Sequence, residues 1–354
     1  MRSVLFFDPA CRQPYDTATR QHQAIGGTEA SVTRIADALG AYVMQHNRAT
    51  RSGQYLPPGR IPGIRQVVVV RDSRCIAQLR EWYSGAQFYL WLHDQVNPGS
   101  MRGRWLRDSV KSPHEQFGNV ICVSDWQRSR IEATLRWLKM ADGVRATTIY
   151  NPVDDTLIPD ETRIDPFKLV FFSSPNKGLP YALDVFRALR RRMPGLRLVV
   201  GNPGYKIMQI PSTEGIRYVG PQPQARIHAE VRGALCTFVP NFLLPETFGL
   251  VYAESKALGT PVLTHDCGSA VEVIGDPEQI LPVRLSCRIY ESLVHRFPLA
   301  WRRGPARLAD RIGLFEAYIE RIRSWQDGGR PRVQPDSRFL LSQVTNQWRS
   351  LLQR

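Results

Sequence analysis

The sequence predicts an α/β protein in which two domains each contain a doubly wound, mostly parallel β-sheet. Three observations favour this fold class. The 354 residues suit two domains of about 150 residues each better than a single core. Short apolar runs alternate with helical patterns, which is the order of βαβ units. The alternation stops at residues 151–167, where proline and aspartate accumulate, and then restarts, so we expect a linker there.

The first domain is predicted over residues 1–155. Its helices and strands are expected to alternate, so that helices cover both faces of the sheet. In the first expected helix, Val32, Ile35 and Leu39 recur at helical spacing, and Thr28 is the expected N-cap. Short β-branched or apolar runs predict strands at residues 3–7, 66–70, 88–92 and 119–123. Helices are expected at residues 27–40, 75–83 and 125–140.

The second domain is predicted over residues 156–335. Its first helix is expected to start near Pro180, and the chain becomes helical again at 307–325 and 337–354. No strand remains for the last helix to cover, so the segment 336–354 is expected to pack its apolar face back on the first domain. Further apolar runs predict strands at residues 168–172, 196–200, 216–219, 236–239 and 260–264.

The composition is strongly basic. The formal net charge is +15, and arginines outnumber lysines by 41 to 6. A basic surface attracts phosphates, but these arginines are spread along the chain without aromatic residues interleaved on one face. An ordinary solvated surface is therefore favoured, and a nucleic-acid partner is not expected. Peripheral contact with a membrane that carries an anionic acceptor stays open.

The sequence predicts a cytoplasmic protein. The first apolar run, "VLFF", ends at Asp8 and Pro9, and no segment approaches the ~20 apolar residues needed to span a bilayer. Any membrane contact would then be peripheral and on the inner face. The six cysteines lack the spacing of metal ligands, and we expect them to be reduced thiols in the core.

Glycine or polar residues follow several predicted strands, at the edge where ligands of doubly wound sheets bind. Gly26 and Gly27 directly precede a helix, whose first amides could hold a phosphate, although an ordinary turn explains them equally well. His93 and Asp94 close the strand 88–92. The histidine either points into a crevice between the domains or is a satisfied structural residue. Neither a Walker loop nor G-x-G-x-x-G is present, so the fingerprints of ATP hydrolysis and NAD binding are missing.

The stretch "PETFGLVYAE" places Glu246 and Glu254 eight positions apart. If a helix starts near Phe248, its first amides form an anion site, and Gly249 lets phosphates approach. Glu254 then lies about 7 to 8 Å further along the axis, roughly the distance from a diphosphate to a ribose. Glu246 faces the other end of the diphosphate. The spacing fits a nucleoside diphosphate sugar with one acid at each end, and the competing interpretation is two surface glutamates placed by chance.

At these residues the chain resembles family 4 glycosyltransferases, which have two facing Rossmann-like domains in the GT-B fold. The E-x7-E element is the most specific feature of the resemblance. Ser173 and Ser174 stand near the place of an arginine that usually precedes the "KGL" lysine, so Lys177 is the main formal cation there. The matching motifs, in order, are "GGTE", "HD", "VICVSDWQRSRI", "IYNPVD", "NKGL" and "PETFGLVYAESKALGTPVLTHDCGSAVEVI".

The resemblance implies a retaining hexosyltransferase. Such an enzyme moves a sugar from a nucleoside diphosphate sugar to a hydroxyl of a glycan or lipid-linked acceptor, in polysaccharide or glycan biosynthesis. It implies no cofactor and no obligatory metal. The implied catalytic residues are His93 and Glu246, and the implied acceptor-binding residues are Glu29 and Asp94. The implied donor-binding residues are Gly26, Gly27, Lys177, Phe248, Gly249, Leu250 and Glu254.

Two other functions compete with glycosyl transfer. A GT-B epimerase or hydrolase of nucleotide sugars would change stereochemistry or release the nucleoside diphosphate without any acceptor. A non-catalytic basic scaffold that binds nucleic acid would show steeply salt-dependent binding, which Glu254→Ala would leave unchanged.

Overall fold

A computed structural model describes residues 2–110, 118–140, 143–202, 213–240, 244–282 and 314–353. The chain divides into two compact units. The first consists of Met1–Arg20, Gly27–Asp155 and Ser337–Arg354, and the second of Gln21–Gly26 and Thr156–Asp336. The start of the helical pattern expected at 307–325 lies outside the described residues up to residue 313, as does Cys287.

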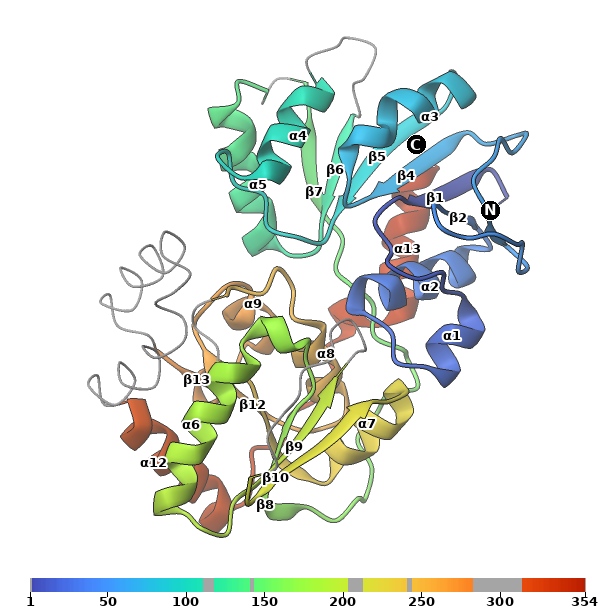
Figure 1. Cartoon of the computed structure of the whole chain (residues 1–354). Helices are drawn as coiled ribbons and strands as arrows, with labels where there is room; N and C mark the ends of the chain where they lie inside the picture. The colour runs from blue at the N-terminus through green and yellow to red at the C-terminus, as the bar shows by residue number, and fades with distance from the viewer. Residues whose placement is uncertain are drawn as a thin grey trace. The chain divides into compact units, whose positions relative to one another are not determined.

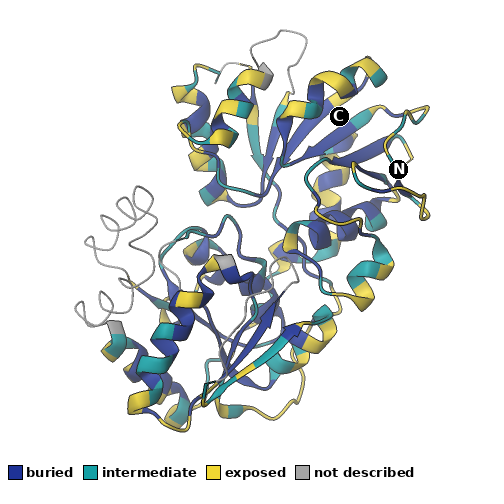
Figure 2. Cartoon of the chain, viewed as in Figure 1, coloured by how far each residue is buried: buried dark blue, intermediate teal, exposed yellow. Residues whose placement is uncertain are grey.

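The first unit is built on a parallel sheet of seven strands within the described residues, in the order β3-β2-β1-β4-β5-β6-β7 (Figure 1). Its central strands are buried along nearly their whole length, as Figure 2 shows. Burial on both faces explains why these strands read as continuous apolar runs rather than as alternating patterns. The strands are β1 (Val4–Asp8), β2 (Tyr42–Gln45), β3 (Tyr55–Leu56), β4 (Gln66–Val70), β5 (Gln87–Leu92), β6 (Asn119–Cys122) and β7 (Arg145–Thr148).

Helices cover both faces of this sheet. On one face, Leu5 and Phe7 belong to the core that α3 (Ile76–Trp82), α4 (Met101–Val110) and α5 (Asp125–Trp137) complete. The other face is covered by α2 and α13. The ring of Trp348 on α13 (Leu341–Leu352) lies 5.6 Å from Phe6 and 4.8 Å from Trp91, and α13 packs beside α2 (Gly27–Leu39). The last helix therefore belongs to the first unit. A short helix, α1 (Thr17–His22), precedes α2.

The second unit contains a parallel sheet of six strands within the described residues, in the order β10-β9-β8-β11-β12-β13. One face is covered by α6 (Leu179–Arg192) and α12 (Leu314–Gly328). On the other face Thr237 contacts Ser255 of α8 (Leu250–Ala257), with 2.7 Å between the hydroxyl oxygens. The remaining elements are β8 (Asp165–Phe171), β9 (Arg197–Asn202), β10 (Ile216–Pro221), β11 (Ala234–Phe238), β12 (Val262–His265), β13 (Ile280–Leu281), α7 (Gln224–Arg232) and α9 (Ala270–Ile274).

Each sheet has a topological switch point. In the first unit the chain adds strands on one side of β1 and then moves to β4 on the other side. In the second unit the corresponding pair is β8 and β11. The loops after the two strands of a switch pair diverge, which leaves room for a ligand at the carboxyl edge of the sheet.

Some element boundaries differ from the predictions. Helix α2 begins at Gly27, so Thr28 lies inside its first turn and not at the N-cap. Helix α8 begins at Leu250, two residues after the expected start, because Gly249 occupies the cap position in the left-handed region (φ 75°). Helix α4 and the strands β2, β3, β7 and β13 were not predicted.

The described cysteines are free thiols, of which Cys11, Cys122 and Cys236 are buried while Cys75 and Cys267 are partly exposed. The prediction of core thiols is therefore correct for three of these five residues. Within the described ranges, no helix has the length and apolar character needed to cross a membrane.

Candidate functional site

The switch point of the second unit brings together Lys177 and Glu246. Lys177 ends a 3-10 turn after β8, and Gly178 (φ 97°) is the N-cap residue of α6. Glu246 lies in the loop between β11 and α8. Their side chains form an ion pair with 2.8 Å between Nζ and Oε2. The side chain of Glu246 is 8% exposed and that of Lys177 is 48% exposed, so the pair has a buried acid and an accessible cation.

The backbone of Glu246 is fixed by the loop that follows β12. The carbonyl oxygen of Glu246 accepts hydrogen bonds from the backbone amide of Ser269 (3.0 Å) and from its hydroxyl (3.1 Å). Gly268 pairs with Glu246 in an isolated bridge and has φ 68°. A Cβ at Gly268 would lie 2.4 Å from that carbonyl oxygen, so only glycine fits there. Two loops therefore fix the acid in one position.

Helix α8 begins directly after this acid. Phe248 is buried and anchors the turn, and Gly249 caps the helix. A Cβ at Gly249 would lie 2.3 Å from the ring of Tyr252, and the backbone there is left-handed, so the position requires glycine. The first amides of a helix lack carbonyl partners within it, and the dipole makes this end positive. Burial, together with the Glu246 charge, raises the pKa of Tyr252 well above its usual range, so its phenol stays neutral.

Glu254 lies further along α8, and its side chain is 5% exposed. Two residues of α7 face its carboxylate. The side-chain amide of Gln224 donates to Oε1 at 3.2 Å, and Nε2 of His228 lies 3.6 Å from Oε2. Gln224 and His228 were not predicted from the sequence. Their spacing of four residues on one helix, directly after a strand of the same sheet, is the signal that could have identified them.

In the first unit His93 follows β5, as predicted. It is 8% exposed, and its ring centroid lies 4.5 Å from that of Trp91. The next residue, Asp94, forms an ion pair with Arg102 at 2.5 Å, and its carbonyl oxygen accepts a hydrogen bond from Gln127 at 2.9 Å. A packed aromatic neighbour therefore restricts the histidine ring, while Asp94 is more exposed.

Glu29 lies in the first turn of α2, close to the switch point of the first sheet. Its carboxylate pairs with Arg71 at 3.3 Å. Arg71 follows β4 and has a left-handed backbone (φ 67°), which is uncommon for a residue other than glycine. Asp8 at the end of β1 accepts a hydrogen bond from the Tyr15 hydroxyl at 2.9 Å. Burial raises the pKa of Asp8; the positive charge of Arg71 opposes that increase, and the negative charge of Glu29 adds to it.

Gly26 directly precedes α2, as predicted, whereas Gly27 was predicted to precede the helix and lies within it. Gly26 is buried, and Gly27 is exposed and forms the first residue of the helix. Gly26 is assigned to the second unit and Gly27 to the first, so the division of the chain falls between them.

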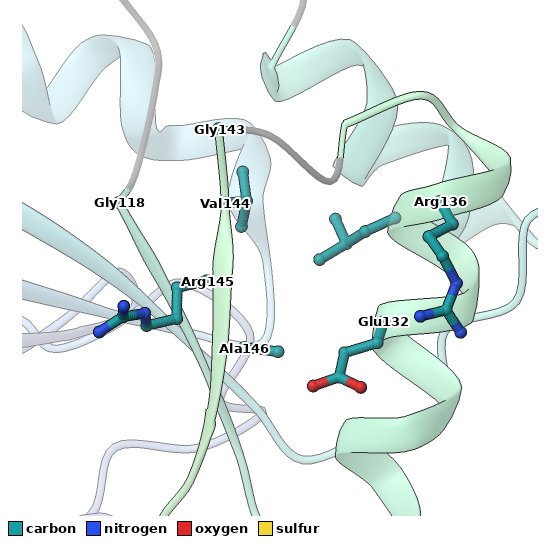
Figure 3. Close-up of a pocket in the computed structure, with 8 residues that line it drawn as sticks. Gly118, Glu132, Arg136, Gly143, Val144, Arg145 and Ala146 are labelled. Atoms are coloured by element: carbon teal, nitrogen blue, oxygen red, sulfur yellow. The ribbon is translucent and has the colours of Figure 1, made fainter.

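One cavity of the first unit, with a volume of about 490 Å³, lies apart from all these residues (Figure 3). It opens between α5 and β7, at the amino ends of the strands, whereas the predicted site residues follow the carboxyl ends. Within the described residues, no group of three or more His, Cys, Asp or Glu side chains is arranged to hold a metal ion. The cavity lining consists of Gly118, Glu132, Leu135, Arg136, Gly143, Val144, Arg145 and Ala146.

Comparison with known proteins identifies the second unit. Residues 163–283 match the family model described as glycosyl transferases group 1. This segment is a group 1 glycosyl transferase domain. It contains Lys177, Glu246 and Glu254, and it also contains Gln224 and His228 of α7, so the polar groups at this sheet edge all lie in the part of the chain that defines the family.

Curated relatives match less than the whole chain. A phosphatidyl-myo-inositol mannosyltransferase of Mycobacterium tuberculosis strain H37Rv is 29% identical over 189 residues, which are 49% of this chain and 48% of the relative. A D-inositol 3-phosphate glycosyltransferase of Nocardia farcinica is 36% identical over 155 residues, which are 39% and 34% of the two chains. The chain thus spans about half the length of the mannosyltransferase that it matches, and less of the second relative.

Solved structures match over nearly the full length. HepE of Anabaena, in complex with UDP-glucose, superposes with a TM-score of 0.64 at 14% identity and covers 99% of both chains. Sucrose-phosphate synthase of Thermosynechococcus elongatus gives a TM-score of 0.63 at 16% identity, over 99% and 98%. The group 1 domain and the first unit therefore share the GT-B fold, as predicted.

Proposed function

We propose that this chain is a retaining hexosyltransferase that moves a sugar from a nucleoside diphosphate sugar to an acceptor hydroxyl. The observation that carries the proposal is the Lys177–Glu246 pair beside the start of α8, at the switch point of a group 1 glycosyl transferase domain. A cation, a helix N-terminus and a buried acid at one sheet edge suit a ligand that carries both phosphate and hydroxyl groups.

In the second unit, each residue has a separate proposed role. Lys177 and the amides of Phe248, Gly249 and Leu250 bind the diphosphate and stabilise its charge as it departs. Glu246, exposed less than its partner lysine, accepts hydrogen bonds from hydroxyls of the donor sugar. Glu254, four residues after the start of α8, accepts hydrogen bonds from the two ribose hydroxyls.

In the first unit, His93 is proposed to hydrogen-bond the donor sugar near the reacting carbon. The packing of its ring against Trp91 supports this role, because a restricted ring loses little freedom on binding. Gly26 and Gly27 are proposed to offer backbone amides to the diphosphate. Asp94 is proposed to bind the acceptor, and Glu29 to do so together with Arg71.

The acceptor is proposed to be a hydroxyl of a glycan or a lipid-linked molecule, in polysaccharide or glycan biosynthesis. The name of one relative, a phosphatidyl-myo-inositol mannosyltransferase, supports a lipid-linked acceptor, and the name of the other contains inositol 3-phosphate, which also presents hydroxyl groups. UDP-sugars are the first donors to test, because HepE was solved with UDP-glucose. The acceptor hydroxyl would attack from the side of the leaving diphosphate, which retains the anomeric configuration.

We propose that turnover needs no bound metal, since Lys177 and the positive end of α8 supply the field that the leaving diphosphate requires. The test is to measure turnover after treatment with EDTA. Undiminished turnover would support the proposal, and a loss that Mg²⁺ or Mn²⁺ restores would overturn it.

The function is tested with a panel of UDP-, GDP- and ADP-sugars, offered with lipid-linked and glycan acceptors. We expect one nucleoside diphosphate to stabilise the protein against heat and its sugar to be transferred with retention. Release of the diphosphate at the same rate without an acceptor would favour a hydrolase or epimerase. Binding of nucleic acid that falls steeply with salt, and that Glu254→Ala leaves intact, would favour a non-catalytic scaffold.

We also propose peripheral contact with an anionic bilayer through the outer face of α5. Trp126, Arg130, Ala133 and Trp137 recur along one side of this helix, and Trp137 is 66% exposed. Tryptophan and arginine suit the interface of a membrane that contains anionic lipid.

The membrane contact is tested by sedimentation with vesicles. Vesicles of phosphatidylglycerol should sediment the protein and those of phosphatidylcholine should not. Trp137→Ala with Arg130→Glu should abolish sedimentation, whereas Ile158→Ala, which removes an exposed apolar residue of the second unit, should not.

A further inference from the structure

The carboxylate of Glu254 is held by a second helix. Gln224 and His228 lie four residues apart on α7, and α7 packs against α8. Both therefore point from one side of α7 toward the same acid. The amide nitrogen of Gln224 lies 3.2 Å from Oε1, while the imidazole Nε2 of His228 lies 3.6 Å from Oε2.

These two distances describe two different kinds of contact. The contact from Gln224 is a hydrogen bond and fixes the orientation of the carboxylate plane. The contact from His228 is longer than a hydrogen bond, and Nε2 has no hydrogen-bond partner within the described residues although it is buried. A buried polar nitrogen without a partner has a free-energy cost that a bound hydroxyl would remove. The side of His228 that faces Glu254 therefore suits a ligand oxygen.

We propose that His228 and Glu254 together recognise one ribose hydroxyl of the donor nucleotide, and that Gln224 positions Glu254 for this contact. The inference rests on the proposed function, in which Glu254 binds the ribose. A hydroxyl group can donate to the Glu254 carboxylate and at the same time accept from Nε2–H of His228. A deoxynucleotide lacks that oxygen and leaves both groups without their shared partner. The pair thus selects ribonucleotide donors over deoxyribonucleotide donors.

The test compares the affinities of wild type and His228→Ala for a nucleoside diphosphate and for its 2′-deoxy and 3′-deoxy forms. The probe is whichever of UDP, GDP and ADP binds the wild type most tightly. We expect His228→Ala to weaken binding of the ribonucleotide roughly tenfold. It should leave the deoxy form that lacks the recognised hydroxyl within about twofold of its wild-type affinity. If His228 had only a structural role, His228→Ala would weaken the binding of all three ligands equally.

Three further variants distinguish a lost ligand contact from a folding defect. His228→Gln retains a side-chain N–H of similar reach and should recover part of the lost selectivity. Arg226→Ala changes an exposed residue of the same helix and should leave all three affinities unchanged. Gln224→Ala should weaken binding of the ribonucleotide by a smaller factor, since Gln224 acts through Glu254.

The outcomes separate this inference from the proposed function. A wild type that binds a nucleoside diphosphate, with His228→Ala unchanged or with all three ligands weakened alike, overturns the inference and leaves the glycosyltransferase proposal intact. A wild type that binds none of UDP, GDP and ADP overturns both.

Discussion

The two switch points place acids in different settings. In the first unit Glu29 pairs with a guanidinium that is itself largely buried, and Asp8 accepts from a fully buried tyrosine. In the second unit, the partner of Glu246 is a lysine whose side chain is about half exposed. The partners of Glu254 are an amide at 3.2 Å and an imidazole at 3.6 Å. The first arrangement contributes to the stability of the fold in addition to the acceptor contact proposed for Glu29, whereas the second can exchange its internal contacts for those of a ligand.

The backbone supports the same distinction. Arg71 has the left-handed conformation that L-residues avoid, which costs roughly 1 to 2 kcal/mol. That cost is sustained because the turn directs the guanidinium toward Glu29. In the second unit the left-handed positions near the acids are glycines, Gly249 and Gly268, which adopt them without strain and keep side chains away from the helix start.

The largest expected effect comes from removing the accessible cation. Lys177→Ala should lower kcat by a factor on the order of 10² to 10³, because the leaving diphosphate loses the charge that stabilises it. The melting temperature should fall less than that of Arg71→Ala, because the half-exposed position of Lys177 lets water approach the Glu246 carboxylate when the lysine is removed. Lys168→Ala, which removes a lysine paired with Glu230 in the same unit, should preserve kcat. Steady-state rates with the accepted donor provide the measurement, and normal turnover of Lys177→Ala would contradict its role.

Breaking the first switch point should affect stability. Arg71→Ala leaves Glu29 buried without its guanidinium partner, so the free energy of unfolding should fall by about 3 kcal/mol. Arg74→Ala is the matched control, because Arg74 also pairs with an aspartate, Asp72, but its side chain is 57% exposed. Arg74→Ala should lower the free energy of unfolding by less than about 1 kcal/mol. Urea denaturation measures both values, and equal losses would show that burial does not distinguish the two pairs.

Within the second switch point, the two acids should separate binding from turnover. Glu254→Ala should raise the donor KM by about tenfold, as expected for a lost ribose contact of roughly 1 to 3 kcal/mol, and leave kcat nearly unchanged. Glu246→Ala should instead lower kcat more than it affects donor affinity. Glu230→Ala removes another glutamate, one paired with Lys168 and Arg217, and should leave both constants alone. An unaltered donor KM in Glu254→Ala would remove this acid from the ribose site.

The sequence predicted those strands that are buried along their whole length. Strands such as Gln66–Val70 are buried on both faces, so they read as unbroken β-branched runs. The edge strand Arg145–Thr148 is at most partly buried and three of its four residues are polar, so no apolar run predicts it. Helix α4 contains three arginines and one glycine in ten residues, so its apolar pattern is too weak to predict a helix.

The residues of the candidate site could be proposed from the sequence one by one, but the contacts among them could not. Glycines and acids after strands identified Gly249, Glu246 and Glu254, because ligand sites of doubly wound folds lie at that edge. The pairing of Lys177 with Glu246 joins positions 69 residues apart and depends on the strand order. His228 was missed because one histidine on a polar helix has many possible orientations, and only the packing of α7 on α8 directs it toward Glu254.

The smallest expected effect concerns a network of the second unit that lies outside its switch pair. His265 at the end of β12 is fully buried, its Nδ1 lies 2.8 Å from the carbonyl oxygen of Leu281, and its Nε2 accepts from the hydroxyl of Tyr318 on α12. Burial lowers the pKa of His265 from 6.5 to about 4; the hydrogen bond to Leu281 and the charge of Asp266 oppose that shift.

Because the unfolded chain protonates His265 more readily than the folded chain, stability should be complete above about pH 6.5 and fall as the pH drops toward 4. The contribution of this one group is at most about 1.4 kcal/mol per pH unit. His265→Asn should reduce the slope of unfolding free energy against pH in this window, whereas His22→Gln, at an exposed position of α1, should retain it. An unchanged slope in His265→Asn would show that other groups, such as the buried acids of the first unit, govern the acid response.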